Sequence, residues 1–199
     1  MSALAITAGF ADPVIEAQAH FHALMNALAR PGSIQSFPAA LDAPAPLTAE
    51  LAAVALTLVD HEATLWLDAT LAAAKPVVDY IRFHTGARIV ADPADAAFAL
   101  VVDVAAMPSL ASFAQGTDEY PDRSTTIILA AASIEPEGSF ELSGPGIQDC
   151  ARIGLSPVPA DFTAQLAINR AQFPRGVDLV FAGTREVAAL PRTTLVSEV

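Results

Sequence analysis

The segment 97–103 reads Ala-Phe-Ala-Leu-Val-Val-Asp, an unbroken apolar run that ends on its first charge. A strand that faces water on one side alternates polar and apolar residues, whereas an unbroken run is typical of a sheet covered on both faces. Shorter, largely apolar segments occupy 63–67, 125–129 and 177–181. Helical patterns separate the strands of the first half, and strands cluster in the second. We therefore predict one α/β domain over 1–199, with a mixed central sheet flanked by helices.

The first helix has clear boundaries in the sequence. Asp12 can cap it, and Pro13 is tolerated at the first helical position. It should end before Arg30-Pro31-Gly32, because a residue before proline disfavours helical backbone and Pro-Gly suits a turn. Its apolar residues are spaced as one stripe, which we expect to face the core: Ile15, Phe21, Leu24, Met25 and Leu28.

Further helices are predicted from Thr48, which caps one, over 77–83, over 108–113 and over 160–172, which Asp161 caps. In the second half, the short strand Phe140–Leu142 is expected to pair with the strand 125–129. The turn Glu135-Pro-Glu-Gly138 would connect the two.

The charge balance excludes two classes of partner. Ten Lys and Arg residues against 22 Asp and Glu give a net charge of −12. That argues against sequence-independent binding to nucleic acid and against adsorption to anionic lipid. The residues after Met1 lack a basic segment, so we expect no signal peptide, and the cytoplasm is the predicted location. Apolar residues make up 53% of the chain, a surplus that suggests that a partner covers part of the surface.

A glycine-proline corner, Leu142-Ser-Gly-Pro-Gly-Ile147, is a candidate anion site. Its backbone N–H groups could face an anion if a helix followed over 147–152, although Pro145 removes one donor. The alternative is that this segment is only a tight structural turn. A polar loop over 116–124 precedes it, and a second proline-glycine corner, Phe173-Pro-Arg-Gly176, follows. We expect these three loops to form one functional edge.

The candidate anion-binding residues combine this corner with cations elsewhere in the chain. Arg82 and His84 lie in the last turn of a predicted helix, where charge compensation of the helix dipole is the alternative role. Arg175 and Arg192 lie beside prolines. The full candidate set is Arg82, His84, Gly144, Gly146, Arg175 and Arg192.

No metal site and no catalytic constellation is expected. Adjacent residues of Asp60-His61-Glu62 point to different faces, and His20 and His22 are two apart on a helix, where metal pairs prefer spacings of three or four. Cys150 is the single cysteine, which excludes an internal disulfide and a multi-cysteine zinc site.

Six segments taken together resemble the PhnH family, subunits of the bacterial carbon–phosphorus lyase system. They are Gln18-x-x-Phe21 with Arg30-Pro-Gly32, Arg82-Phe-His-Thr85, the Gly116-Thr117 loop, Leu142-Ser-Gly-x-Gly-Ile147, Phe173-Pro-Arg-Gly-Val-Asp178 and Leu190-Pro-Arg-Thr-Thr194. The resemblance covers essentially the whole chain.

This resemblance implies a subunit of a core complex with PhnG, PhnI and PhnJ, acting in phosphonate degradation, and a homodimer when isolated. It implies a fold like the large domain of pyridoxal-phosphate-dependent transferases, without that cofactor. The residues also argue against this cofactor, because pyridoxal phosphate binds through a Schiff-base lysine. Lys75 is the one lysine, and it lies directly before Pro76 with no glycine-rich phosphate loop nearby.

Two functional hypotheses remain open. The first is a non-catalytic subunit that works through protein–protein contacts. The second is a small-molecule site for a phosphonate or a ribosyl-triphosphate intermediate, built from the candidate anion-binding residues. Whether the chain is itself an enzyme is left open.

Overall fold

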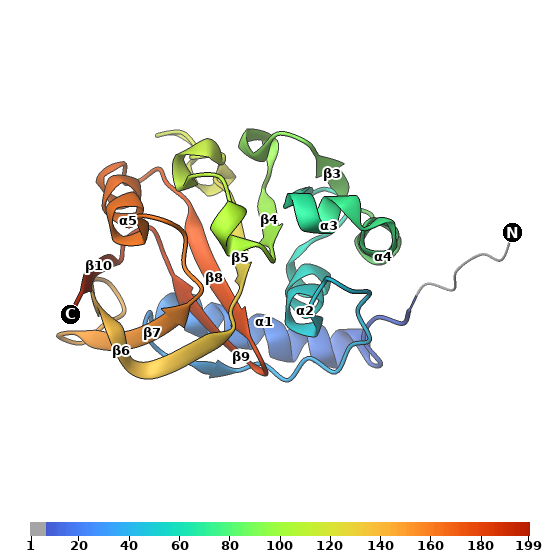
Figure 1. Ribbon diagram of the computed structural model, residues 1–199, viewed down its shortest axis with the longest axis horizontal. Helices are drawn as coiled ribbons and strands as arrows, with labels where there is room; N and C mark the ends of the chain where they lie inside the picture. Colours follow the sequence, from blue (N-terminus) through green and yellow to red (C-terminus); the bar gives the residue numbers. More distant parts are fainter. Residues whose placement is uncertain (1–6) are drawn as a thin grey trace, which may run out of the picture.

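A computed structural model describes residues 7–199 as one α/β unit (Figure 1). The helices are α1 (Pro13–Ala29), α2 (Ala49–Leu58), α3 (Ala69–Ala73), α4 (Lys75–Thr85) and α5 (Phe162–Ala171). The strands are β1 (Gln35–Ser36), β2 (Thr64–Leu67), β3 (Arg88–Val90), β4 (Phe98–Val101), β5 (Thr126–Ala130), β6 (Ser133–Ser143), β7 (Ala151–Ser156), β8 (Asp178–Gly183), β9 (Glu186–Leu190) and β10 (Leu195–Glu198). The prediction that the chain starts without a signal peptide concerns residues outside this range.

The central sheet has seven strands in the order β1-β9-β8-β5-β4-β2-β3. Neighbouring strands from β8 to β3 pair in parallel, whereas β9 and β1 add antiparallel edges. The sheet is therefore mixed, as predicted. The apolar runs of the sequence supply its four central strands β8, β5, β4 and β2.

Side chains of each central strand alternate between two separate cores. On β5, Ile128 packs on the α1–α2 side, whereas Ile127 and Leu129 pack on the α5 side. On β8, Val180 and Phe181 divide in the same way. All five side chains are fully buried. The unbroken apolar runs arise because both faces of the sheet are covered, by helices on one side and by α5 with a small sheet on the other (Figure 1).

The small sheet has the order β10-β6-β7 and is antiparallel throughout. The predicted pairing of Phe140–Leu142 with the strand 125–129 is wrong, because Phe140 and Leu142 pair with β7 on one side and with β10 on the other. The predicted strand 140–142 is confirmed as part of β6, but the predicted turn Glu135–Gly138 lies inside the same strand, at the register shift between Pro136 and Phe140.

Helix α1 begins where predicted, with Asp12 accepting a hydrogen bond from the backbone N–H of Ile15 at 3.2 Å. Its predicted inward stripe is wrong in part. Leu24 is buried, but Ile15, Phe21 and Met25 are 65%, 47% and 50% exposed. The helix lies against β9, β1 and α2 (Figure 1) through the face that carries His20, Leu24 and Ala27. Leu28 is partly buried against the same core, as predicted.

Among the other predicted helix features, the Thr48 cap is confirmed by a 3.2 Å hydrogen bond from the N–H of Leu51. Asp161 adopts left-handed backbone at φ 51° and its side chain makes no cap hydrogen bond, so that prediction is wrong. The predicted helix 108–113 is reduced to a single 3-10 turn, Leu110–Ser112. No helix between residues 7 and 199 is long and apolar enough to cross a membrane.

Tyr80 on α4 gives a test of this packing. Its side chain is 1% exposed, and its hydroxyl has no hydrogen-bond partner within residues 7–199. Burial, and secondly the charge of Asp42, raise the pKa of this phenol above its ordinary value. A raised folded-state pKa gives stability that is present below the unfolded value of about 10 and is lost as the pH rises through the folded value.

We expect Tyr80→Phe to remove part of this alkaline loss of stability while leaving the free energy of unfolding at pH 7 unchanged or slightly higher, since an unpaired hydroxyl is removed. Urea unfolding at pH 7 and above pH 10 measures both. Tyr120→Phe is the matched control, because Tyr120 is 47% exposed. The prediction would be contradicted if the free energy of unfolding fell as much above pH 10 in Tyr80→Phe as in the unmodified chain.

Candidate functional site

Arg192 joins three loops at the edge where β5 and β8 begin. Its Nε donates to Oδ1 of Asp178 at 3.2 Å, and its Nη2 to Oδ2 of the same carboxylate and to Oγ of Ser124 at 2.6 Å. Its Nη1 donates to the carbonyl oxygens of Pro121 at 2.9 Å and Pro174 at 3.2 Å. All five N–H donors of the guanidinium are thereby used within the chain. Arg192 holds the edge together and has no donor left for an anion in this structure.

The other predicted arginine of this edge is far more exposed. Nε of Arg175 lies 3.3 Å from Oδ1 of Asp118, and the two side chains are 45% and 80% exposed. An exposed pair of this kind contributes little to stability. Two of the three loops predicted to share one edge meet here, since Asp118 belongs to the polar loop and Arg175 to the second proline-glycine corner.

The glycine-proline corner has a structural role. No helix follows it, because β7 begins at Ala151. Gly146 adopts φ 82°, and a Cβ atom there would lie 2.2 Å from the carbonyl oxygen of Ala29 at the end of α1. A Cβ at Gly144, with φ 132°, would lie 3.1 Å from the carbonyl oxygen of Thr193. Both glycines are needed for close backbone packing, which favours the tight structural turn.

A hollow of about 320 Å³ lies beside this corner, lined by Pro145, Arg170, Phe173 and Thr193. The Nε of Arg170 donates to the carbonyl oxygen of Thr193 at 3.3 Å, and its Nη groups make no hydrogen bond to any residue from 7 to 199. Phe173 is 63% exposed. The candidate anion-binding set drawn from the sequence did not include Arg170, because nothing in the local pattern shows that α5 ends against the corner.

Arg82 and His84 do not join this edge. They lie on α4, at the opposite end of the molecule from α5 (Figure 1). Nε2 of His84 lies 2.9 Å from the carbonyl oxygen of Thr7, and the ring packs against Tyr80. Arg82 is exposed. The six predicted anion-binding residues are therefore split between two ends of the sheet.

The carboxyl ends of the parallel strands hold a carboxylate that sequence reasoning missed. The chain places β2 between β3 and β4, so the strand order reverses there, and ligands of open α/β sheets commonly bind at such a point. Here Asp68 occupies it. Its Oδ1 accepts from the N–H of Leu71 at 2.8 Å, and its Oδ2 from Val102 and Asp103 at 2.7 and 2.8 Å. Asp68, which is 4% exposed, thus ties the end of β2 to the end of β4.

The remaining candidate groups lie apart. His20 is buried between Phe10 and Phe37, with its Nε2 3.3 Å from the carbonyl oxygen of Pro38. Lys75 forms an exposed ion pair with Asp79 one helical turn away. No group of three or more His, Cys, Asp or Glu side chains within residues 7–199 is placed to hold a metal ion.

Comparison with known proteins gives the family. The model of the PhnH family, described as bacterial phosphonate metabolism proteins, matches residues 8–197. The alpha-D-ribose 1-methylphosphonate 5-triphosphate synthase subunit PhnH of Rhizobium meliloti (strain 1021) is 43% identical over 185 residues, which are 93% of this chain and 92% of that protein. A putative C-P lyase subunit protein, HtxG of Stutzerimonas stutzeri, is 34% identical over 79 residues, 40% of each chain.

The chain therefore belongs to the PhnH family of bacterial phosphonate metabolism proteins. This confirms the resemblance read from the six segments. Two of those segments also touch in the structure, because a Cβ at Gly32 would meet the Cβ of Ala151 and Leu142, while Gly146 packs on Ala29 and Pro31. Gly32 and Gly146 thus fix how α1 sits against the small sheet.

The two arginines of the edge give a matched test. Arg192→Gln should lower the free energy of unfolding by about 3 kcal/mol, because it removes charge-assisted hydrogen bonds and leaves the carboxylate of Asp178, which is 20% exposed, without its cation. Arg175→Gln should change it by less than about 0.5 kcal/mol, because its ion pair is exposed. Chemical denaturation measures both, and equal effects would refute the structural role of Arg192.

Proposed function

We propose that this chain is a non-catalytic subunit of the carbon–phosphorus lyase core complex in organophosphonate catabolism, acting through contacts with PhnG, PhnI and PhnJ. The R. meliloti relative, which the chain matches over nearly its full length, is named as a subunit of a synthase. The setting we propose is the cytoplasm.

The exposed face of α1 is the observation that carries this proposal. Val14, Phe21 and Met25 are 79%, 47% and 50% exposed, and their spacings of seven and four place them on one stripe of the helix. Gln18 lies within the same stripe. The spacing 14, 18, 21, 25 is that of alternate core positions in a coiled coil, which favours an apolar partner helix or groove. Large exposed apolar side chains that share one helix face are a common mark of a protein contact.

The same stripe suits the homodimer expected of the isolated chain. A two-fold axis would place the helix against its own copy in antiparallel orientation, with equivalent side chains on both sides. We propose that the partner subunits replace this copy in the complex. The likeness to the large domain of pyridoxal-phosphate-dependent transferases stays a prediction.

The test is assembly with purified PhnG, PhnI and PhnJ. Phe21→Asp should weaken binding at least tenfold, because a buried aromatic anchor is commonly worth about 2 kcal/mol or more. Phe83→Asp on α4 is the matched control, since Phe83 is also exposed, at 68%. The mass of the complex by light scattering reports the result, and thermal unfolding checks that both variants fold. Undiminished assembly by Phe21→Asp would exclude α1 as the contact.

A second candidate function is a small-molecule site for a phosphonate or a ribosyl-triphosphate intermediate. The hollow beside the glycine-proline corner favours it, because Arg170 offers two free Nη groups there and Arg is well suited to phosphate-like anions. Gly144, Gly146, Arg175 and Arg192 belong to the loops around it. In this version Arg170 is the cation, and Arg192 holds the loops.

This second candidate predicts a ligand-dependent thermal shift. A ribosyl-triphosphate at 100 times its Kd should stabilise the folded chain by about 2.7 kcal/mol. Arg170→Gln should abolish most of that shift, whereas Arg88→Gln, at an exposed position on β3, should retain it. Methylphosphonate alone tests the smaller ligand. A shift of equal size in both variants would exclude the hollow as the binding site.

A further inference from the structure

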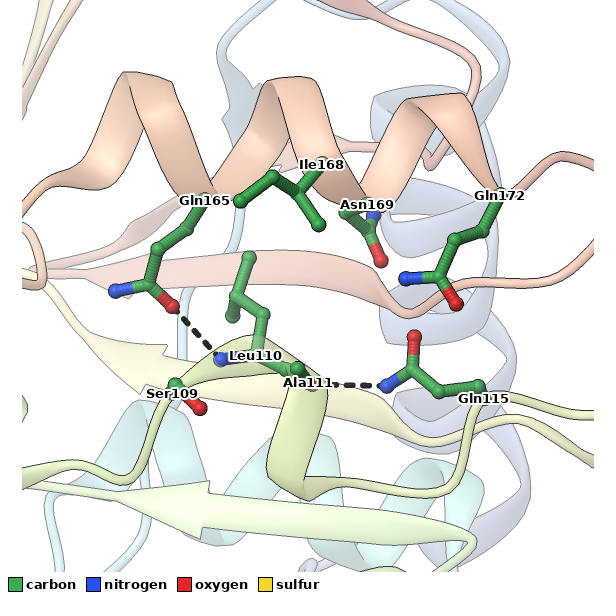
Figure 2. A pocket seen from close by; sticks show the side chains of 8 residues that line it. All are labelled: Ser109, Leu110, Ala111, Gln115, Gln165, Ile168, Asn169 and Gln172. Atoms are coloured by element: carbon green, nitrogen blue, oxygen red, sulfur yellow. Dashed lines mark hydrogen bonds between the residues drawn. The ribbon is translucent and has the colours of Figure 1, made fainter.

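A second pocket, of about 220 Å³, lies on the other side of the end of α5 and is not accounted for by the subunit role or the Arg170 hollow (Figure 2). One wall is the face of α5 that carries Gln165, Ile168, Asn169 and Gln172, at the helical spacing of three, four and seven residues. The other wall is the segment 109–111. The eight lining residues include three glutamines and one asparagine but no charged side chain.

Two of these carboxamides are fixed by hydrogen bonds within the chain. Oε1 of Gln165 accepts from the N–H of Leu110 at 2.8 Å, and its Nε2 donates to the carbonyl oxygen of Ala160 at 2.7 Å. Asn169, 3% exposed, pairs both amide atoms with the backbone of Val177 at 2.9 and 2.8 Å. These bonds hold α5 against the segments at Leu110 and Val177.

Gln115 closes the floor of the pocket and is only half satisfied. Its Nε2 donates to the carbonyl oxygens of Leu110 and Phe113, both at 2.8 Å, which fixes the orientation of the amide. Its Oε1 is therefore directed to the opposite side, where it is buried with no partner among residues 7–199. A buried acceptor without a donor costs about 1–3 kcal/mol.

Gln172 faces this oxygen from α5. Figure 2 shows its carboxamide pointing toward that of Gln115 across the pocket, with no hydrogen bond drawn between them. Gln172 is half-buried at the end of the helix, and a glutamine side chain can rotate away to admit another group. Together the two amides offer an acceptor at Gln115 and a donor–acceptor pair at Gln172. Leu110 and Ile168 supply apolar surface beside them.

We propose that this pocket binds a small, uncharged heteroaromatic molecule whose edge presents an N–H donor next to an acceptor. The apolar walls suit the faces of a flat ring, and the two carboxamides suit its polar edge, as glutamine does when it pairs with adenine. Because no charged side chain lines the pocket, it is a poor site for a phosphate or phosphonate, in contrast to the Arg170 hollow. A free nucleobase and an aromatic carboxamide share this edge chemistry.

The test is to titrate the full chain with adenine, nicotinamide or methylphosphonate. Binding is monitored through the side-chain N–H signals of glutamine in ¹⁵N NMR spectra. Adenine or nicotinamide should shift the signals of Gln115 and Gln172 saturably, and the tighter of the two identifies the source of the ligand. Methylphosphonate should leave them unchanged. Saturable shifts with methylphosphonate would overturn the proposal. So would the absence of saturable shifts with both adenine and nicotinamide at millimolar concentration.

A variant pair keeps the test independent of folding. Gln172→Leu retains the size of the side chain and removes its amide edge, so binding should weaken about tenfold while the Gln115 signals stay in place. Gln148→Leu, in the exposed turn before β7, should bind as the unmodified chain does. If Gln172→Leu binds the probes as tightly as the unmodified chain does, the pocket is merely hydrated. The same conclusion follows if a bound water contacts the Gln115 amide and persists when the probes are added. None of these outcomes depends on assembly with other subunits.

Discussion

The guanidinium of Arg192 is the single group on which the loop edge depends. It lies at the end of β9, yet its hydrogen-bond acceptors belong to residues 14, 18, 68 and 71 positions away in the chain. The central strands β5 and β8 thus begin at positions that one cation fixes. Such a cation is stable in a partly buried position only when each donor is matched and the carboxylate of Asp178 balances its charge.

The segments that resemble the PhnH family serve packing in this chain more visibly than they serve chemistry. Gly32 and Gly146 allow the end of α1, the glycine-proline corner and β7 to approach within contact distance. Asp68 fills the position at which sheets of this kind commonly bind ligands. What is left uncommitted is an apolar helix face, an arginine beside Phe173 and a set of carboxamides. Each of these suits recognition of another molecule better than it suits bond-making.

The sequence predicts the sheet better than it predicts the site. Burial on both faces leaves a long apolar run in the sequence, so the central strands could be placed from composition and period alone. β6 could be placed only over 140–142, because its register shift between Pro136 and Phe140 removes the alternation on which strand prediction depends. For α1, spacing showed which residues share a face, but only tertiary packing decides that Leu24 faces the core and Met25 faces outward. The role of Arg192 comes from distant contacts that leave no local signal. The orientation of the Gln115 amide is likewise set by two backbone carbonyl groups, those of Leu110 and Phe113, and has no signal in the sequence.

The alternation of side chains between two cores has a consequence for association. Because β5 and β8 contribute to both layers, neither layer can loosen without exposing the other, and the chain should open as a single cooperative unit. A surface carried by such a body is already ordered before it meets another molecule. Little of the free energy of contact is then spent on ordering backbone, so even a narrow apolar stripe on one helix can hold a partner firmly.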